Sequence, residues 1–516
     1  MAMAGRAAII ILLLIILIGT AIRLVLIGNQ GFFEGDNFYY FAVMKETLAN
    51  NGIIPNPLPL SGFPVHMPYQ EFPGLIYATL IPYWLLLGIV PLIWVMYAMP
   101  VVFGMLGMVL AYLITMKLLS DRRMALVSAA TFSFMPAAAF RDMALQYRGE
   151  SFVPILLALF IYLQLSDRRP QRLASIALIP VMLIFWKGSV YIIPVILAAL
   201  LMFAFERKPL FVRAALMAAI SIAVLALSPT VFLLMEQSQN VLRGVGEVVP
   251  PSIGFAAMFL SITLVLAPVA WLYTLMRMPS AVKKRTHLGN IDARAWTWLT
   301  AILLVAVPLF MVQSRWIFLL AMPFAVFSAK GVGLTYDFAK ARIRPINPMA
   351  MLLPIFLFLA MFAMQSYSIN LNTAPLLEAG SWINQSTQSN STFLTLWYEG
   401  SFIEGWGNRI SYTESVNFNS SRAEDFSAFM LAKPGNYTYL QRIKPDYLLV
   451  DTRWAQSGIG PELEQYINIT NSSRLNLNDT NFAHLIQDNF TGLRAVYNYN
   501  SIIIYNVTPL WQMQSK

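Results

Sequence analysis

Apolar runs long enough to cross a membrane recur along the first 370 of the chain's 516 residues. The hydrocarbon core of a bilayer is roughly 30 Å thick, so a spanning helix needs about 20 consecutive apolar residues. With 58% hydrophobic and only 12% charged residues, the chain is predicted to be a polytopic α-helical membrane protein of about eleven to thirteen spans. The runs lie near 8–28, 91–116, 124–140, 151–167, 173–187, 188–205, 211–232, 255–277, 295–312, 315–333 and 349–366.

The charges between the runs predict which loops face the cytoplasm. Lys and Arg gather in every second loop, as the positive-inside bias requires of cytoplasmic loops, and the alternate loops hold acidic residues. The pattern predicts a multi-pass protein of the cell membrane with a cytoplasmic N-terminus and an extracytoplasmic C-terminal part. It also accounts for the net charge of +10, so no nucleic-acid partner is expected.

Two apolar segments need a separate interpretation. The run 8–28 resembles a signal peptide, but no small-residue cleavage site follows it and Arg23 interrupts it, so we predict a retained first span. The stretch 75–90 is apolar but short and broken by Pro. We predict that it forms an interfacial helix within a long first external loop, 29–90.

Past residue 370 the composition changes to Asn, Ser, Thr and Tyr, which predicts an exported mixed α/β domain over 371–516. "PDYLLVDTR" and "LRAVYNYNSIIIYNVT" are typical of a buried strand and a hairpin, and "SRAEDFSAFMLA" of a helix. All nine Asn-x-Ser/Thr sequons lie in this part, which favours glycosylation on an external face over chance. Their Asn residues are Asn384, Asn390, Asn419, Asn436, Asn468, Asn471, Asn478, Asn489 and Asn506.

Four features on the predicted external side are candidates for chemistry. "FFEGDNFYYFAVMKETLANNG" contains Asp36, "FRDMALQYRGES" contains Arg141 and Glu150, "RGVGEVVPPSIGF" contains Glu247, and "QSRWIFLL" contains Arg315. Each also has a plain structural explanation: a helix N-cap for the Asp, snorkelling charges at the interface, and a simple connector for the Gly- and Pro-rich loop. Their shared side of the membrane favours a common site.

With these motifs assembled, the chain resembles the catalytic subunit of oligosaccharyltransferase in its single-subunit archaeal form. The resemblance implies a GT-C-type membrane domain over 1–370. It also implies inverting, metal-dependent transfer of an oligosaccharide from a dolichyl phosphate or diphosphate donor to the Asn of Asn-x-Ser/Thr sequons. The implied partners are the lipid-linked donor, acceptor polypeptides and membrane lipid, with no further subunit required.

The resemblance assigns roles to the acidic motifs. "GDNFYY" is similar to the family's first acidic motif, which makes Asp36 a metal ligand that also contacts the acceptor amide. "RDMALQYRGE" is similar to the second, with Glu150 as metal ligand and Arg141 as donor-phosphate contact. "GEVVPPSIGF" is similar to the family's Glu-x-x-Pro loop, with Glu247 facing the acceptor amide. Carboxylate ligands suit a hard cation, Mn²⁺ or Mg²⁺.

The sequon would be recognised by a different set of residues. "LTLWYEGSFIEGWGNR" resembles the family's WWDYG region, so Trp397, Tyr398 and Glu399 are expected to bind the sequon hydroxyl. Arg315 matches an Arg that favours an acidic residue before the acceptor Asn.

The chain departs from the family pattern at three places. Arg148 stands at the first acidic position of the second motif, which leaves a metal ligand to water or His66. Tyr398 stands where an ungapped alignment expects Asp, although a one-residue deletion would put Glu399 there. No clear Asp-x-x-Lys helix motif is present, and "VDTRWAQSGIG" is its expected location.

Three other interpretations stay open. Another lipid-sugar-dependent transferase of this architecture would need the first acidic motif but neither the Glu247 loop nor the Trp-rich region. A transporter or flippase would place ionisable residues at mid-depth in the spans, which are almost free of charge here. An inactive peptide- or lipid-binding paralogue is kept open by Arg148 and Tyr398.

Overall fold

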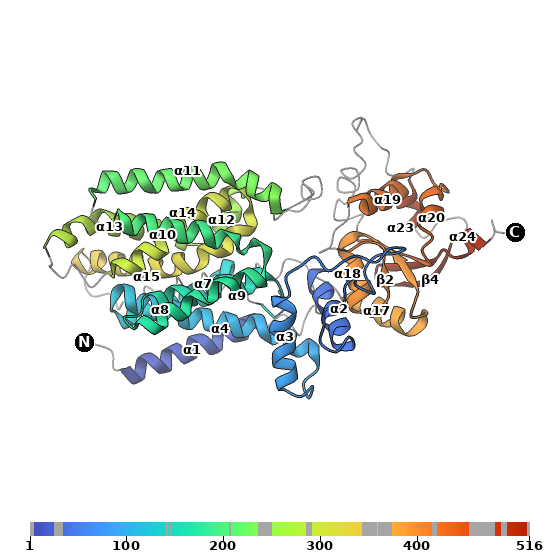
Figure 1. The fold of residues 1–516 in the computed structure, drawn as a ribbon, viewed down its shortest axis with the longest axis horizontal. Helices are drawn as coiled ribbons and strands as arrows, with labels where there is room; N and C mark the ends of the chain where they lie inside the picture. Colours follow the sequence, from blue (N-terminus) through green and yellow to red (C-terminus); the bar gives the residue numbers. More distant parts are fainter. Residues whose placement is uncertain are drawn as a thin grey trace. The chain divides into compact units, whose positions relative to one another are not determined.

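The computed structural model describes residues 5–24, 35–140, 143–144, 146–205, 208–235, 250–284, 292–342, 355, 359, 374–414, 420–453, 480–486 and 493–512. The chain divides into two compact units (Figure 1). Unit 1 comprises Met1–Leu26, Trp94–Gln237 and Gly246–Asn370, and unit 2 comprises Ile27–Ile93, Ser238–Val245 and Leu371–Lys516. The first external loop thus groups with the C-terminal part, whereas the functional domains 1–370 and 371–516 stay a prediction.

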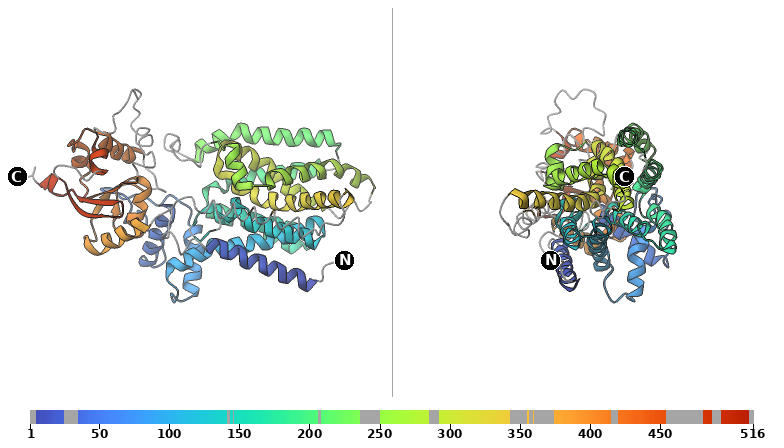
Figure 2. Two further views of the ribbon diagram at one scale, coloured as in Figure 1. Left: turned by 180° about the vertical axis from the view of Figure 1, so that it is seen from behind. Right: turned by 90° about the vertical axis from the view of Figure 1, so that its left-hand side faces the viewer.

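Unit 1 is a helical bundle, and its helices run alongside one another in both views of Figure 2. Its elements are α1 (Gly5–Leu24), α4 (Leu92–Leu119), α5 (Arg122–Phe134), α6 (Pro136–Ala139), α7 (Gly149–Gln164), α8 (Arg169–Ile176), α9 (Leu178–Phe185), η2 (Lys187–Tyr191), α10 (Ile192–Ala204), α11 (Leu210–Met235), α12 (Ile253–Leu260), α13 (Thr263–Lys284), α14 (Ala293–Val312), η4 (Ser314–Trp316) and α15 (Ile317–Arg342). The core is built around α14 and α15, which pack against each other and against α5, α10, α11 and α13.

Helices lie on every predicted apolar run except 349–366, most of which is outside the described residues. Within the described part of the chain, four helices are long and apolar enough to cross a membrane: Arg6–Leu24, Leu92–Leu119, Ala293–Val312 and Ser314–Asp337. A fifth candidate is the pair Ile253–Leu260 and Thr263–Met276, which is bent by 84°. The protein is a multi-pass membrane protein, and its full number of spans stays a prediction.

The first helix shows how a charge is accommodated in unit 1. Side chains such as Ile9 and Leu17 are exposed, as expected of a helix that faces lipid. Arg23, near its end, is fully buried, and its Nη1 donates hydrogen bonds to the carbonyl oxygens of Gly19 (3.1 Å) and Ser133 (3.0 Å). Arg23 therefore fastens α1 to α5, because a guanidinium in apolar surroundings must find acceptors.

Unit 2 combines helices with a five-stranded sheet. Its helices are α2 (Gly35–Ala49), α3 (Gly74–Leu85), α17 (Ala374–Ser386), α18 (Trp397–Gly405), α19 (Ser420–Leu431), α20 (Thr438–Ile443), α23 (Asn481–Ile486) and α24 (Pro509–Gln512). Its strands are β1 (Thr392–Leu394), β2 (Ile410–Ser411), β3 (Tyr447–Asp451), β4 (Arg494–Tyr499) and β5 (Ile502–Asn506), in the order β2-β1-β3-β5-β4. β3 pairs parallel with β1 and antiparallel with β5. The predicted strand, hairpin and helix are confirmed as β3, β4–β5 and α19.

The first external loop contributes to this sheet. Ser61 forms a parallel bridge with Ser411, and the Ser411 N–H donates to the Leu60 carbonyl at 3.1 Å. The loop therefore covers the edge of β2, whose backbone groups need partners. Later in the loop, α3 is about 18 Å long at 1.5 Å per residue, too short to span a bilayer. Its exposed Leu85, and Leu87 and Ile89 beyond it, agree with the predicted interfacial helix.

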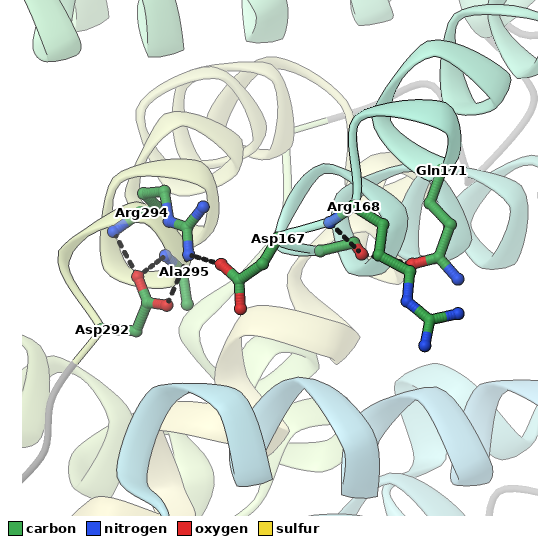
Figure 3. A network of polar contacts seen from close by, with 7 residues as sticks. Asp167, Arg168, Gln171, Asp292, Arg294 and Ala295 are labelled. Atoms are coloured by element: carbon green, nitrogen blue, oxygen red, sulfur yellow. Dashed lines mark hydrogen bonds and ion pairs between the residues drawn. The ribbon is translucent and has the colours of Figure 1, made fainter.

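A network of polar contacts lies at the start of α14 (Figure 3). The Asp292 carboxylate accepts hydrogen bonds from the N–H groups of Arg294 (2.8 Å) and Ala295 (3.4 Å), as an N-cap does. Arg294 in turn pairs with Asp167 at 3.0 Å, which connects α14 to the segment after α7.

We expect Asp292→Ala to lower the stability of unit 1 by about 1 kcal/mol, because two helical N–H groups lose their acceptor. Thermal unfolding of the full chain in detergent measures this. Asp292→Asn is the matched control, since Asn is an equally good N-cap. Equal losses in both variants would contradict the capping role.

Candidate functional site

The predicted first acidic motif and the Trp-rich motif meet in unit 2, where α2 packs against α18 (Figure 1). The rings of Phe38 and Phe402 meet edge to face at 5.2 Å, and Phe41 lies 6.4 Å from Trp406. At Gly405 the two backbones approach so closely that a Cβ would lie 2.3 Å from the Phe38 carbonyl oxygen. Two motifs more than 350 residues apart in sequence therefore lie on helices that pack against each other.

Asp36 lies in the first turn of α2 and is half-buried. A carboxylate at this position interacts favourably with the helix dipole. The next residues, Asn37 and Phe38, are buried, which fixes the start of the helix. Asp36 therefore lies in the first turn of a helix that is held in place by its packing against α18.

The predicted sequon-binding residues lie at the start of α18. Trp397 is half-buried and packs against the core of unit 2. Glu399 is 1% exposed, and its carboxylate accepts a hydrogen bond from the Thr395 hydroxyl at 3.0 Å. In this conformation the hydrogen bond of Glu399 connects the first turn of α18 to the residues just before it. The side chain of Tyr398 is outside the described part of the structure.

A group of carboxyls that the sequence did not single out, two of them buried and one half-buried, connects α2, α18 and the first external loop. Glu46 accepts a hydrogen bond from the Leu60 N–H at 3.0 Å, and Glu414 accepts one from the Ser61 hydroxyl at 2.5 Å. Glu404, on α18, is 1% exposed and shares a hydrogen bond with Glu414. We call Glu46, Glu404 and Glu414 the carboxyl cluster. The sequence gives one hint of this cluster: Glu404 directly follows two apolar residues, Phe402 and Ile403, which the structure shows to be buried.

The surroundings of the carboxyl cluster favour the protonated form. The pKa of Glu46 is raised to about 7, chiefly by burial and also by the charge of Glu414, while the Leu60 N–H bond and Lys45 act in the opposite direction. Burial raises the pKa of Glu404 well above its usual value, and Glu414 adds to this by charge and hydrogen bonding. Two cations lie near the carboxyl cluster: Lys45 beside Glu46, and Arg422, whose guanidinium donates to the carbonyl oxygens of Tyr412 (3.1 Å) and Val65 (2.8 Å).

In unit 1, Glu150 lies in the first turn of α7 and is 8% exposed. It lines a pocket whose other lining side chains are apolar, among them Phe132, Pro154 and Phe318. Gly149 makes the position accessible to Trp186, because a Cβ there would lie 2.3 Å from the Trp186 Cβ. A carboxylate in such surroundings is stabilised by a positive partner.

Arg315 lies on the η4 turn of the same unit. Its Nε donates to Gln313 Oε1 at 3.0 Å, and its guanidinium lies 5.7 Å from the centre of the Trp316 ring. Trp316 is 1% exposed and contacts Trp186 at 5.5 Å between ring centres. One aromatic cluster therefore supports both the segment with Arg315 and the start of α7 with Glu150.

The remaining predicted residues, Arg141 and Glu247, lie outside the described residues. Asp36 belongs to unit 2 and Glu150 to unit 1, and each is described within its own unit. In the part of the chain that the structure describes, no group of three or more His, Cys, Asp or Glu side chains is arranged to hold a metal ion. The roles assigned to individual site residues stay predictions.

Comparison with known proteins confirms the resemblance expected from the motifs. No family model matches the chain. Dolichyl-phosphooligosaccharide-protein glycotransferase 2 of Archaeoglobus fulgidus is 28% identical over 207 residues, which are 39% of this chain and 34% of that protein. The match therefore spans about a third of the length of that relative.

Solved structures confirm the GT-C-type fold. The A. fulgidus oligosaccharyltransferase tethered to an acceptor peptide with an NVT sequon matches with a TM-score of 0.72 and 15% identity, over 99% of this chain and 81% of that one. Other structures of that enzyme, with dolichol-phosphate and an inhibitory peptide or with Zn and sulfate, match with a TM-score of 0.70. ArnT from Cupriavidus metallidurans with undecaprenyl phosphate matches less well, with a TM-score of 0.53 and 10% identity over 97% of this chain and 98% of that one.

We expect Gly405→Ala to destabilise unit 2 by about 1–3 kcal/mol through overpacking against Phe38. In an unconstrained helix the same change is stabilising by up to about 1 kcal/mol, so the sign tests the close contact. The control is Gly254→Ala, because among the described residues a new Cβ there would meet Ser252 Oγ at an ordinary contact distance of 3.7 Å. Thermal unfolding of both variants decides, and a stable Gly405→Ala chain would refute the close packing.

The raised pKa of Glu46 predicts that stability falls as pH rises. Between its unfolded value of 4.5 and its folded value of about 7, the folded chain binds more protons than the unfolded chain, so the free energy of unfolding decreases through this window. Thermal unfolding of the full chain between about pH 5 and 8 should show this decrease, and Glu46→Gln should flatten it. An unchanged slope in the variant would contradict the assignment.

Proposed function

We propose that this protein is an oligosaccharyltransferase: it transfers an oligosaccharide from a lipid-linked donor to the Asn of Asn-x-Ser/Thr sequons. The observation that carries the proposal is the packing of α2, with Asp36 in its first turn, against α18, the helix of the Trp-rich motif. Both motifs resemble those of the oligosaccharyltransferase family, and a chain built for another purpose has no evident need to join them.

The fold comparison supports this choice over another lipid-sugar transferase. The likeness to the A. fulgidus oligosaccharyltransferase is closer, with a TM-score of 0.72, than the likeness to ArnT, with 0.53. The chain also has a C-terminal α/β part, over 371–516, that carries the Trp-rich motif. The donor would be a dolichyl phosphate or diphosphate, and the chain would work without partner subunits.

The proposed chemistry follows from the poor nucleophilicity of a carboxamide. The lone pair of the Asn Nδ2 is delocalised into the carbonyl, so the amide must be polarised and twisted before it attacks. Asp36 and Glu247 would accept its two N–H bonds and turn it out of conjugation. Nδ2 would then attack the sugar C1 from the face opposite the phosphate, with inversion, while Arg141 contacts the departing phosphate.

Asp36 and Glu150 are the proposed ligands of a divalent cation, Mn²⁺ or Mg²⁺. Carboxylate oxygens are suitable donors for a hard cation, and Glu150 lines an otherwise apolar pocket, where its charge is costly without a positive partner. Such an ion would neutralise charge on the leaving lipid phosphate. Arg148 holds the N-cap position of α7, where the family pattern has an acidic residue, so water or His66 would complete the ligand set.

Recognition of the acceptor would involve α18 and η4. Trp397 would form a wall for the sequon side chain, and Arg315 would favour an acidic residue before the Asn. The sequon hydroxyl would bind Glu399 by replacing the Thr395 hydroxyl, its partner at 3.0 Å. Tyr398 is the neighbouring contact. An inactive peptide- or lipid-binding paralogue is the alternative that the assay below separates.

The test is incubation of the purified full chain with a lipid-linked oligosaccharide, Mn²⁺ and a fluorescent Asn-x-Thr peptide. We expect a shifted glycopeptide, and a loss of rate of at least about 100-fold in Asp36→Ala and in Glu247→Gln, because each removes a group that acts on the reacting amide. Glu424→Gln, an exposed carboxylate on α19, is the matched control and should keep full activity.

The proposal fails if the wild-type chain gives no glycopeptide, or if the Asp36 and Glu247 variants behave like the Glu424 control. Omission of Mn²⁺ and addition of a chelator should abolish the product. Activity that survives the chelator would remove the proposed cation.

A further inference from the structure

Four of the nine sequons of unit 2 have their Asn among the described residues: Asn384, Asn390, Asn436 and Asn506. They share one short pattern but lie in four different structural settings. We propose that the folded chain is itself a glycan acceptor, modified at Asn436 in preference to the other three and not at Asn506. The inference rests on the proposed function, because the donor and the chemistry are those of that reaction.

Asn436 is presented on an exposed turn. It follows Pro434 and Gly435 directly, and both Asn436 and Thr438, which is the hydroxyl residue of its sequon and the first residue of α20, are exposed. The Asn436 Oδ1 accepts hydrogen bonds from the Thr438 N–H (3.2 Å) and hydroxyl (2.8 Å). Because a backbone N–H can only donate, this contact identifies the Oδ1 atom, and Nδ2, the reacting atom, takes no part in it.

A buried neighbour holds this turn in place from behind. Asn481 is fully buried, and its side chain accepts from the Gly435 N–H at 3.2 Å and donates to the Asn436 carbonyl at 3.2 Å. A third bond, at 2.8 Å, ties it to the Phe429 carbonyl on α19. The backbone of Asn436 is therefore fixed while its side chain stays outside.

Asn506 has the opposite setting. It ends β5, which lies between β3 and β4, and it pairs with Tyr447 on one side and Arg494 on the other. Its Oδ1 accepts from the Thr508 N–H at 3.0 Å, and the Thr508 hydroxyl reaches the Asp446 carbonyl at 3.4 Å. An enzyme that binds three consecutive residues would first have to draw the strand away from both neighbours, which requires local unfolding.

The other two sequons are intermediate. Asn390 is exposed, but its Thr392 begins β1, and both the N–H and the hydroxyl of Thr392 donate to Asp446, at 2.9 and 3.0 Å. Asn384 and its sequon residue Ser386 are both exposed but lie in the last turn of α17, and the carbonyl and Oδ1 of Asn384 accept hydrogen bonds from Arg409 at 2.8 and 3.5 Å. Among the four described sequons, Asn436 is the one with an exposed Asn whose Oδ1 accepts from both the N–H and the hydroxyl of its own exposed sequon Thr.

The reaction at Asn436 is a balanced group transfer. A bond forms between Nδ2 and C1 of the glycan, and the bond between C1 and the lipid phosphate oxygen breaks. The phosphate leaves with the bonding electron pair, and Nδ2 loses one proton to solvent. The co-reactant is the lipid-linked oligosaccharide of the proposed reaction, and nothing is oxidised or reduced.

The experiment uses the purified full chain, expressed without donor and then incubated with a lipid-linked oligosaccharide of known mass and Mn²⁺. Protease digestion and mass spectrometry give the occupancy of each sequon. Two synthetic peptides, 431–442 and 501–512, are present as free acceptors in a parallel reaction. We expect both peptides to be modified, whereas in the folded chain occupancy at Asn506 is at least about tenfold lower than at Asn436.

Variants sharpen the assignment. Asn436→Gln and Thr438→Val should each remove the added mass from that segment, while Asn384→Gln should leave it unchanged. If both free peptides are modified but the folded chain is not modified at Asn436, or is modified equally at Asn506, the inference is wrong and the proposed function stands. If neither peptide is modified, the proposed function fails and this inference fails with it.

Discussion

The packing of α2 against α18 is the contact on which unit 2 depends. Phe38 and Phe402 supply the apolar part of this contact, and Gly405 allows the backbones to approach. The first external loop, which contains α2, also supplies Phe63 to the core around the C-terminal strands. The loop also covers the edge of β2 through Ser61, so the two segments stabilise each other.

The same arrangement brings three carboxyl groups together, and their charges would repel one another. Bringing α2 onto α18 places Glu46, Glu404 and Glu414 close together in a region with little solvent. Neighbouring carboxylates in such a region disfavour one another's ionised forms, as the raised pKa values of Glu46 and Glu404 indicate. The stability of unit 2 is thereby coupled to pH. The coupling acts through Glu46, near the end of α2, whereas Asp36 lies in the first turn of the same helix.

Unit 1 positions its own candidates by packing rather than by charge. Trp186 and Trp316 lie in one aromatic cluster, which supports both the first turn of α7 and the η4 turn. Glu150 and Arg315 are therefore carried by segments that are fixed independently of any ligand. Preorganised side chains of this kind are what electrostatic catalysis requires.

The sequence by itself determined the membrane helices, the strands of the C-terminal part and the identity of the candidate motifs, because hydrophobic length, period-two alternation and short motifs are local properties. It did not reveal the carboxyl cluster, the partner of Glu399 or the differing exposure of the sequons. The carboxyl cluster depends on contacts between segments more than 350 residues apart, and sequons of the same Asn-x-Thr pattern, such as those of Asn436 and Asn506, have different surroundings in the folded chain. The tertiary structure alone decided these features, since burial and hydrogen-bond partners are set by the assembled chain and not by its neighbours in sequence.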